Sequence, residues 1–205
     1  MKKSSNILQL KATLTGIKPA IWRRILVPAD YTFFDLHIAL QDAFGWFDCH
    51  LHQFFTGNPY KRGSNWQCIA FPMPEMEDAI DERKTKLFDW FKAPKDSMLY
   101  EYDFGDSWMH KIKFEKILAR EDRGIYPQIL DGARACPPED CGGIGGYQDL
   151  LNVLADPKDQ EYANMLEWLG IKKAEEFDSE RFDKNNVVFC DPKKALREFE
   201  ENLDM

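Results

Sequence analysis

Hydrophobic and polar residues alternate in the first part of the chain, which is the pattern of β-strands with one buried face. The segment 7–14 places four apolar side chains on one face: Leu8, Leu10, Ala12 and Leu14. A second strand-like segment spans 21–27, and the residues between the two, 15–19, include the glycine and proline of a turn. We therefore predict that 7–14 and 21–27 form a hairpin.

Apolar residues then recur at helical spacing, as Phe33, Leu36, Leu40 and Phe44. Thr32 and Asp35 have the spacing of a capping box, in which two side chains bond the free N–H groups at the start of a helix. Gly45 is a typical residue for the end of a helix. The pattern predicts an amphipathic helix over 33–44.

The middle of the chain predicts shorter elements. Segments 50–56 and 65–71 have the composition of two further strands. Residues 72–83 are acidic and rich in proline and methionine, which is typical of a surface loop, and a short helix is predicted over 87–91.

A central hairpin is predicted around residues 105–107. Tyr102 and Phe104 lie on one face of its first strand, and Trp108 and His110 lie on one face of its second strand. A three-residue loop at 105–107 would place Phe104 opposite Trp108, and Tyr102 opposite His110. We expect this register because it brings all the large apolar side chains to one side of the sheet.

The C-terminal half predicts helices. Prolines and glycines exclude a central strand over 136–146. Two apolar stripes at helical spacing follow: Tyr147, Leu150, Leu151 and Leu154, then Tyr162, Met165, Leu166 and Leu169. The pairs at 156–157 and 191–192 are both Asp-Pro, a helix-start signal. We predict an α+β fold, with an antiparallel sheet of hairpins packed with helices, helices concentrated in the C-terminal half, and a single domain over 1–205.

Net charge restricts the classes of partner that we expect, and cysteine content indicates the cellular location. The chain has 205 residues, of which 44% are hydrophobic, and a formal net charge of −8, so we do not expect nucleic acid as a partner. Its basic clusters, 22–24 and 61–62, are short. Five scattered cysteines, an odd number, favour reduced thiols and a cytoplasmic location. No run of 18 apolar residues predicts a membrane helix. A protein or peptide partner is compatible with these features, and the oligomeric state is not indicated.

Six stretches, in order along nearly the whole chain, carry a family resemblance. They are GIKPAIWRR at 16–24 with VP at 27–28, GW at 45–46 with HLH at 50–52, YDFGDSW at 102–108 with His110, ACPPEDCGG at 135–143 with GY at 146–147, DP at 156–157 with LEWL at 166–169, and FD at 177–178 and 182–183. By these motifs the chain resembles the plasmid-borne ORF-3-like family of prokaryotic proteins. The resemblance implies one α+β domain, sometimes encoded beside mobile-element genes, and supplies no catalytic residues.

The histidines suggest a metal site. On a strand, His50 and His52 would point to one face, close enough to share a divalent ion. A third ligand could come from His110, Asp103 or Asp106, which would leave a position open for water. The alternative is that His50 and His52 only hydrogen-bond to neighbouring side chains, and that His110 only satisfies Tyr102.

A second set of residues suggests a binding site at the hairpin tip and the later loop. Its members are Asp103, Asp106, Trp108, Cys136, Glu139, Asp140 and Cys141. The spacing of Cys136 and Cys141 is not that of a zinc knuckle, so the thiols are interpreted either as packed side chains or as a redox pair. The glycine-rich run 142–146 could cradle an anion or simply form a tight crossing.

Three functional hypotheses follow from these residues. The first is a binding or adaptor module that uses the aromatic hairpin. The second is a small metal-dependent, hydrolase-like enzyme that uses a histidine cluster. The third is a DNA-related role associated with mobile elements, against which the acidic charge argues.

Overall fold

The computed structural model of the protein describes residues 6–76 and 78–203, whose strands form one eight-stranded sheet. The strands are β1 (Asn6–Leu14), β2 (Trp22–Pro28), β3 (His52–Phe55), β4 (Cys68–Ala70), β5 (Ile80–Asp81), β6 (Ser97–Tyr102), β7 (Trp108–Ala119) and β8 (Gln128–Ala133). Their order across the sheet is β5-β4-β3-β6-β7-β1-β2-β8. The neighbouring strands are antiparallel except for the short parallel pair of β4 and β5.

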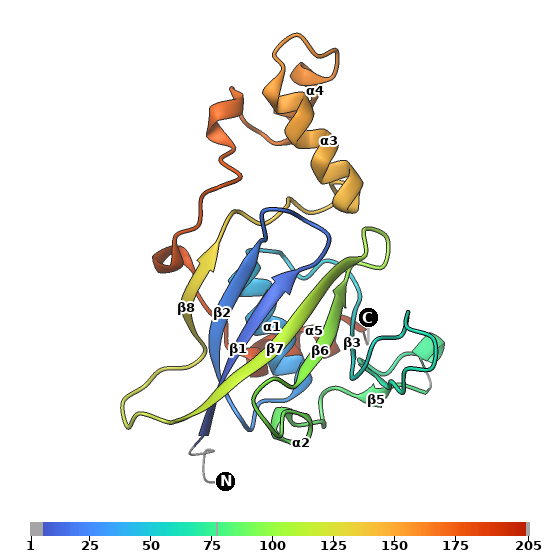
Figure 1. The fold of residues 1–205 in the computed structure, drawn as a ribbon, viewed down its shortest axis with the longest axis vertical. Coiled ribbons are helices and arrows are strands. Elements are labelled where there is room, and N and C mark those ends of the chain that lie inside the picture. The colour runs from blue at the N-terminus through green and yellow to red at the C-terminus, as the bar shows by residue number, and fades with distance from the viewer. Residues whose placement is uncertain (1–5, 77, 204–205) are drawn as a thin grey trace.

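Two pairs of helices differ in their position relative to the sheet (Figure 1). The helices are α1 (Phe33–Phe44), α2 (Leu87–Trp90), α3 (Gly143–Ala155), α4 (Tyr162–Trp168) and α5 (Pro192–Leu203), with short 3-10 turns η1 (Pro74–Met76), η2 (Ala174–Glu176) and η3 (Lys184–Asn186). Helices α1 and α5 lie behind the sheet, whereas α3 and α4 project beyond one end of the central strands. The predicted α+β class and the concentration of helices in the C-terminal half are confirmed. No helix of the described residues is long and apolar enough to cross a membrane.

The N-terminal elements agree with the sequence patterns. β1 and β2 pair in register from Ile7 opposite Pro28 to Thr13 opposite Trp22. The capping box of α1 forms as predicted, since the backbone N–H of Asp35 donates to Thr32 Oγ1 and the N–H of Thr32 donates to Asp35 Oδ2. The apolar face of α1 and the inner face of the sheet together form the main hydrophobic core.

The central hairpin has a longer loop than predicted. Tyr102 pairs with Trp108 and Tyr100 pairs with His110, so the loop spans the five residues 103–107. The predicted pairings of Phe104 with Trp108 and of Tyr102 with His110 are both wrong. The reason lies in Asp103, which leaves the strand with a φ of 58° and accepts hydrogen bonds from the backbone N–H groups of the loop. Phe104 is consequently 40% exposed.

The face assignment of the second hairpin strand is confirmed. Its four inward residues are fully buried: Trp108, His110, Ile112 and Phe114. Tyr100 and Tyr102 are buried beside them on the neighbouring strand. The hairpin is therefore a central part of the core.

The predicted surface loop 72–83 is partly wrong. The segment contains η1 and β5, and one of its residues, Glu82, is completely buried. The backbone N–H of Glu82 donates to the carbonyl of Ala70 at 3.0 Å, which extends the pairing between this segment and β4. The sheet therefore ends in the short strand β5, which the acidic composition of the segment did not predict.

The start of α3 and the start of α4 also differ from the predictions. α3 begins at Gly143, so most of the glycine run is the first turn of the helix and does not form a loop ahead of it. Asp156 ends α3 instead of starting the next helix, because its carboxylate accepts the N–H of Lys158 in a turn, and α4 begins only at Tyr162. The Asp-Pro signal at 191–192 does begin α5.

Candidate functional site

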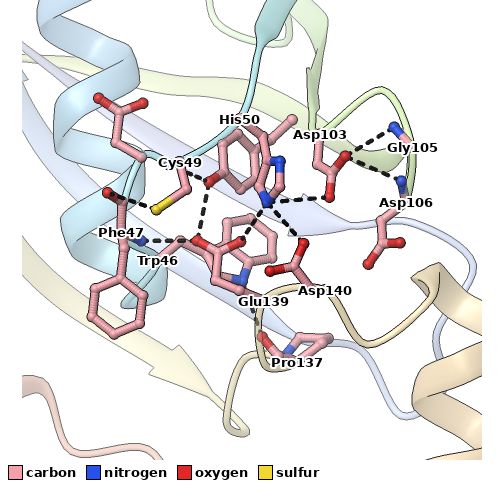
Figure 2. Close-up of polar contacts among 12 residues, drawn as sticks. Trp46, Phe47, Cys49, His50, Asp103, Gly105, Asp106, Pro137, Glu139 and Asp140 are labelled. Carbon is pink, nitrogen blue, oxygen red and sulfur yellow. Dashed lines mark hydrogen bonds and ion pairs between the residues drawn. The ribbon is translucent and has the colours of Figure 1, made fainter. Parts of the chain in front are cut away.

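Three loops meet beside the tip of the central hairpin (Figure 2). They are 46–51 before β3, the hairpin loop 103–107, and 136–142 before α3. The backbone N–H of Asp103 donates to the carbonyl of Leu51 at 2.9 Å, which ties the first loop to the second. Asp106 Oδ2 accepts the N–H of Gly142 at 3.1 Å, and Trp46 Nε1 donates to the carbonyl of Pro137 at 3.0 Å, so the third loop is held to both.

One imidazole and three carboxylates converge where these loops meet. The group comprises His50, Asp103, Glu139 and Asp140, and is called the His50 cluster below. His50 Nε2 lies 3.0 Å from Asp140 Oδ1, 3.7 Å from Asp103 Oδ2 and 4.0 Å from Glu139 Oε2. The ligand atoms of His50, Asp103 and Asp140 all lie within 4.8 Å of one another, which is close enough to surround a single ion.

Each inner carboxylate is held through hydrogen bonds to one of its oxygens, while its other oxygen faces His50. Asp103 Oδ1 accepts the N–H of Gly105 at 2.8 Å. Glu139 Oε1 accepts the hydroxyl of Tyr102 at 3.0 Å and the N–H of Phe47 at 2.9 Å. Within 6–76 and 78–203, the buried atoms Glu139 Oε2 and His50 Nε2 have no hydrogen-bond partner. The loops therefore fix the groups while their inward atoms stay available to a ligand.

The carboxylates of the His50 cluster have no lysine or arginine of residues 6–76 and 78–203 beside them. In the part of the chain that the structure describes, no lysine or arginine forms an ion pair with the carboxylates of the cluster. Burial, with Glu139 as the next contribution, raises the pKa of Tyr102, so this hydroxyl remains a neutral donor to Glu139. The side chain of Asp140 is 69% exposed, whereas those of Asp103 and Glu139 are 9% and 12% exposed. The cluster thus has a buried side and a side open to solvent.

A second cluster takes one of its residues, Asp48, from the same loop before β3. It comprises His37 from α1, Asp48, His52 from β3, and Glu82 after β5, and is called the stacked-histidine cluster below. The rings of His37 and His52 are stacked, with centroids 3.4 Å apart and planes 3° apart. His37 Nε2 lies 2.7 Å from Asp48 Oδ1, and His52 Nε2 lies 2.8 Å from Glu82 Oε2.

Comparison with known proteins places the chain in a family. The sequence model of the plasmid pRiA4b ORF-3-like proteins matches residues 6–186. The chain belongs to this family. It is 36% identical over 174 residues to the uncharacterized protein y4hQ of Sinorhizobium fredii (strain NBRC 101917 / NGR234), an alignment that covers 81% of this chain and 82% of that protein.

A solved structure is similar to this ORF-3-like protein throughout. It is the crystal structure of the protein of unknown function MM3350 from Methanosarcina mazei Go1, with 41% sequence identity and a TM-score of 0.79. The match covers 91% of this chain and 99% of that one. Neither relative is described with an activity, and the family is one of unknown function. Both clusters lie within the matched residues.

The three histidines predicted to share one metal do not meet in this ORF-3-like protein. His50 precedes β3 instead of lying on it, since β3 begins only at His52, and Asp48 turns the chain with a φ of 56°. His50 and His52 therefore enter different clusters. His110 lies in the core, where its Nδ1 is 3.0 Å from the carbonyl oxygen of Trp108, and burial lowers its pKa to about 3. The prediction of a shared His50, His52 and His110 site is corrected accordingly.

The remaining predicted site residues have several different roles. Asp103, Glu139 and Asp140 join the His50 cluster, while Asp106 links two of its loops. Trp108 is fully buried in the core.

The two cysteines of the later loop are packed side chains. All five cysteines, each within the described residues, are free thiols. Cys136 and Cys141 pack against the main core, and burial raises the pKa of both thiols, that of Cys141 to about 12. These contacts support the packing interpretation over the redox pair.

Sequence reasoning missed His37, Asp48 and Glu82. His37 lies on the face of α1 that packs on the sheet, where the helical pattern predicts only a core residue. The acidic neighbours of Glu82 predict a surface loop. Only the sheet register and the packing of α1 bring these residues to His52, so no local pattern in the sequence could have grouped them.

Proposed function

We propose that this ORF-3-like protein binds a divalent metal ion at the His50 cluster. The observation that carries the proposal is the convergence of His50 Nε2 and Glu139 Oε2, which lie 4.0 Å apart. Both atoms are buried and have no hydrogen-bond partner in residues 6–76 and 78–203, and the ion-pair contacts of His50 Nε2 are all to carboxylates of the same cluster. Buried polar atoms in proteins are normally paired, so a pair of unsatisfied atoms that face each other points to a missing ligand. A metal ion between them would satisfy both.

Electrostatics support a cation at this position. Three carboxylates and one imidazole stand together, and none of the ion pairs of the described residues brings a lysine or arginine to them. Burial of uncompensated carboxylates is costly, and a divalent ion would offset most of their charge. A set rich in carboxylate oxygen suits Mn²⁺ or Mg²⁺, and the imidazole favours Mn²⁺ of the two.

The exposed side of the cluster determines what such an ion could do. Asp140 borders solvent, so an ion held here would keep coordination positions for water or for an oxygen of a ligand. A metal ion with bound water lowers the pKa of that water and polarises a neighbouring carbonyl or phosphoryl oxygen. Among the hypotheses from the sequence, the metal-dependent, hydrolase-like enzyme is the one that this arrangement supports best.

The other two hypotheses have weaker support. The hypothesis of a binding module relies on aromatic side chains of the hairpin that could form a groove for a partner. Two of these side chains, Tyr102 and Trp108, are buried in the core. In the basic cluster 22–24, Arg23 is buried against the carbonyl of Ala43, and Arg24 pairs with Glu115. A protein or peptide partner stays a prediction, and these contacts support the expectation that nucleic acid is not a partner.

Calorimetric titration of the purified, metal-stripped protein with Mn²⁺ tests the proposal. We expect a binding event that His50→Ala weakens by about tenfold or more, because it removes one of the inner ligand atoms. Asp149→Asn is the matched control, since Asp149 is an exposed carboxylate on α3 outside the cluster, and its titration should equal that of the wild type. Absence of Mn²⁺ binding, or equal binding by His50→Ala, would show that the proposal is wrong.

A further inference from the structure

The stacked-histidine cluster is more deeply buried than the His50 cluster. The side chains of His37 and Glu82 are 0% exposed, that of His52 is 8% exposed, and that of Asp48 is 28% exposed. Each imidazole faces one carboxylate, and no lysine or arginine among the described residues is ion-paired to either carboxylate. With both imidazoles neutral, the buried negative charge of Glu82 and the partly buried one of Asp48 would therefore stand uncompensated.

The rings are placed by contacts behind them. His37 Nδ1 lies 2.8 Å from the hydroxyl of Tyr100, which also accepts a hydrogen bond from Gln41 Nε2 at 2.9 Å. These contacts direct the other nitrogen of His37 toward Asp48. Outer contacts of this kind orient the histidines of metal sites and select their tautomer.

Three further observations point to a ligand. Glu82 Oε1 is buried and has no hydrogen-bond partner within the part of the chain that is described. A small cavity of about 20 Å³ borders His37, Asp48 and His52, with His50 and several apolar side chains completing its wall, and it has room for one water-sized group. One nitrogen of each histidine and one oxygen of Asp48 lie within 4.8 Å of one another.

We infer that the stacked-histidine cluster is a second metal site, separate from the His50 cluster, which takes a divalent ion of the zinc class. The ligand atoms that lie together are those of two imidazoles and Asp48, with Glu82 bonded to His52 beside them, and a set with two imidazoles suits Zn²⁺ better than Mn²⁺. A metal–nitrogen bond lies in the plane of its imidazole, so the two parallel rings must tilt apart to reach one ion. Zinc binding is therefore accompanied by loss of the 3° stacking between His37 and His52.

Zinc titration of the His50→Ala protein separates this inference from the proposed function. Metal-stripped His50→Ala should still bind one equivalent of Zn²⁺, and X-ray absorption should show two imidazoles bound to it. The His50→Ala substitution leaves the stacked-histidine cluster intact, so the measurement does not require a variant with a substituted core residue to fold. No zinc binding, or zinc without two imidazole ligands, would overturn the inference whatever the Mn²⁺ result.

A pair of glutamate variants assigns the zinc to the cluster. Glu82→Gln in the His50→Ala background should weaken Zn²⁺ binding by about tenfold or more. Glu101→Gln is the matched control, since Glu101 is also a buried glutamate on the same sheet but hydrogen-bonds to Gln53 and Ser107, and it should bind Zn²⁺ unchanged. Equal loss in both variants, or loss in neither, would contradict the assignment. If Mn²⁺ binding survives His50→Ala while zinc behaves as expected, the proposed function fails and this inference stands.

Discussion

His50 Nε2 lies 3.0 Å from Asp140 Oδ1, in a contact that joins the loop before β3 to the loop before α3. The two atoms are close, yet His50 Nε2 forms no hydrogen bond within the described residues. Asp103 and Glu139 approach the same nitrogen from the hairpin tip and from the later loop. Carboxylate oxygens therefore lie on several sides of this one nitrogen.

Replacement of Glu139 by glutamine should separate metal affinity from stability. The glutamine side chain can still accept the hydrogen bonds of Tyr102 and Phe47 through its carbonyl oxygen, while an amide nitrogen replaces the inward Oε2. Because a buried negative charge is removed, the metal-free variant should unfold at the wild-type temperature or above it. The rise in unfolding temperature that saturating Mn²⁺ gives to the wild type should be lost. A variant that keeps this rise would show that Glu139 is not a ligand.

The contact between α3 and the hairpin loop should control the geometry of the site. Gly143 has a φ of 67°, and a Cβ there would lie 2.6 Å from the carbonyl oxygen of Asp106. Gly143→Ala should therefore destabilise the protein by about 1–3 kcal/mol and weaken Mn²⁺ binding, since the loop that carries Glu139 and Asp140 must shift.

Gly145→Ala is the control for that substitution. A Cβ at Gly145 would meet no atom within 4 Å, so alanine should stabilise α3 by about 0.5–1 kcal/mol and leave Mn²⁺ affinity unchanged. Chemical unfolding and calorimetric titration measure both effects. Similar behaviour of the two variants would contradict the account of how the loop is held.

Acid should destabilise the protein partly through His110. Burial lowers the pKa of His110 in the folded state to about 3, from an ordinary value of 6.5. Between these values the unfolded chain binds a proton that the folded chain does not, so stability decreases as the pH falls from 6.5 toward 3, by about 1.4 kcal/mol per pH unit for this group.

Substitution of His110 by glutamine should remove that contribution. A glutamine side chain does not titrate, so the free energy of unfolding of His110→Gln should fall less steeply than that of the wild type between about pH 6 and pH 5. The buried His37 remains in both proteins and contributes equally to each slope. Equal slopes for the two proteins, measured by urea unfolding at a series of pH values, would show that His110 titrates normally.

The sequence predicted elements whose signals are local. The helix α1 could be placed because Thr32, Asp35 and Gly45 mark its two ends, and the inward face of β7 follows from simple alternation. The hairpin loop was predicted too short because the Asp103 carboxylate replaces strand pairing by bonds to the backbone of the loop. That competition depends on side-chain geometry, which alternation alone does not contain.

The candidate site was predictable only in part. Asp103, Glu139 and Asp140 stood out as polar residues in turn-rich segments, and His50 as part of a histidine pair. These residues come together because two hydrogen bonds, between Asp106 and Gly142 and between Trp46 and Pro137, position loops that are distant in the sequence. Glu82 could not be chosen because its burial depends on the pairing of β4 with β5.

The metal site can be located by anomalous X-ray diffraction from crystals of the metal-stripped protein soaked in Mn²⁺. We expect an anomalous peak at the manganese edge within coordination distance of His50 Nε2 and of carboxylate oxygens of Asp103, Glu139 and Asp140. A fully soaked crystal with no anomalous peak at this position, or with its manganese bound elsewhere, would contradict the claim that the His50 cluster is a metal site.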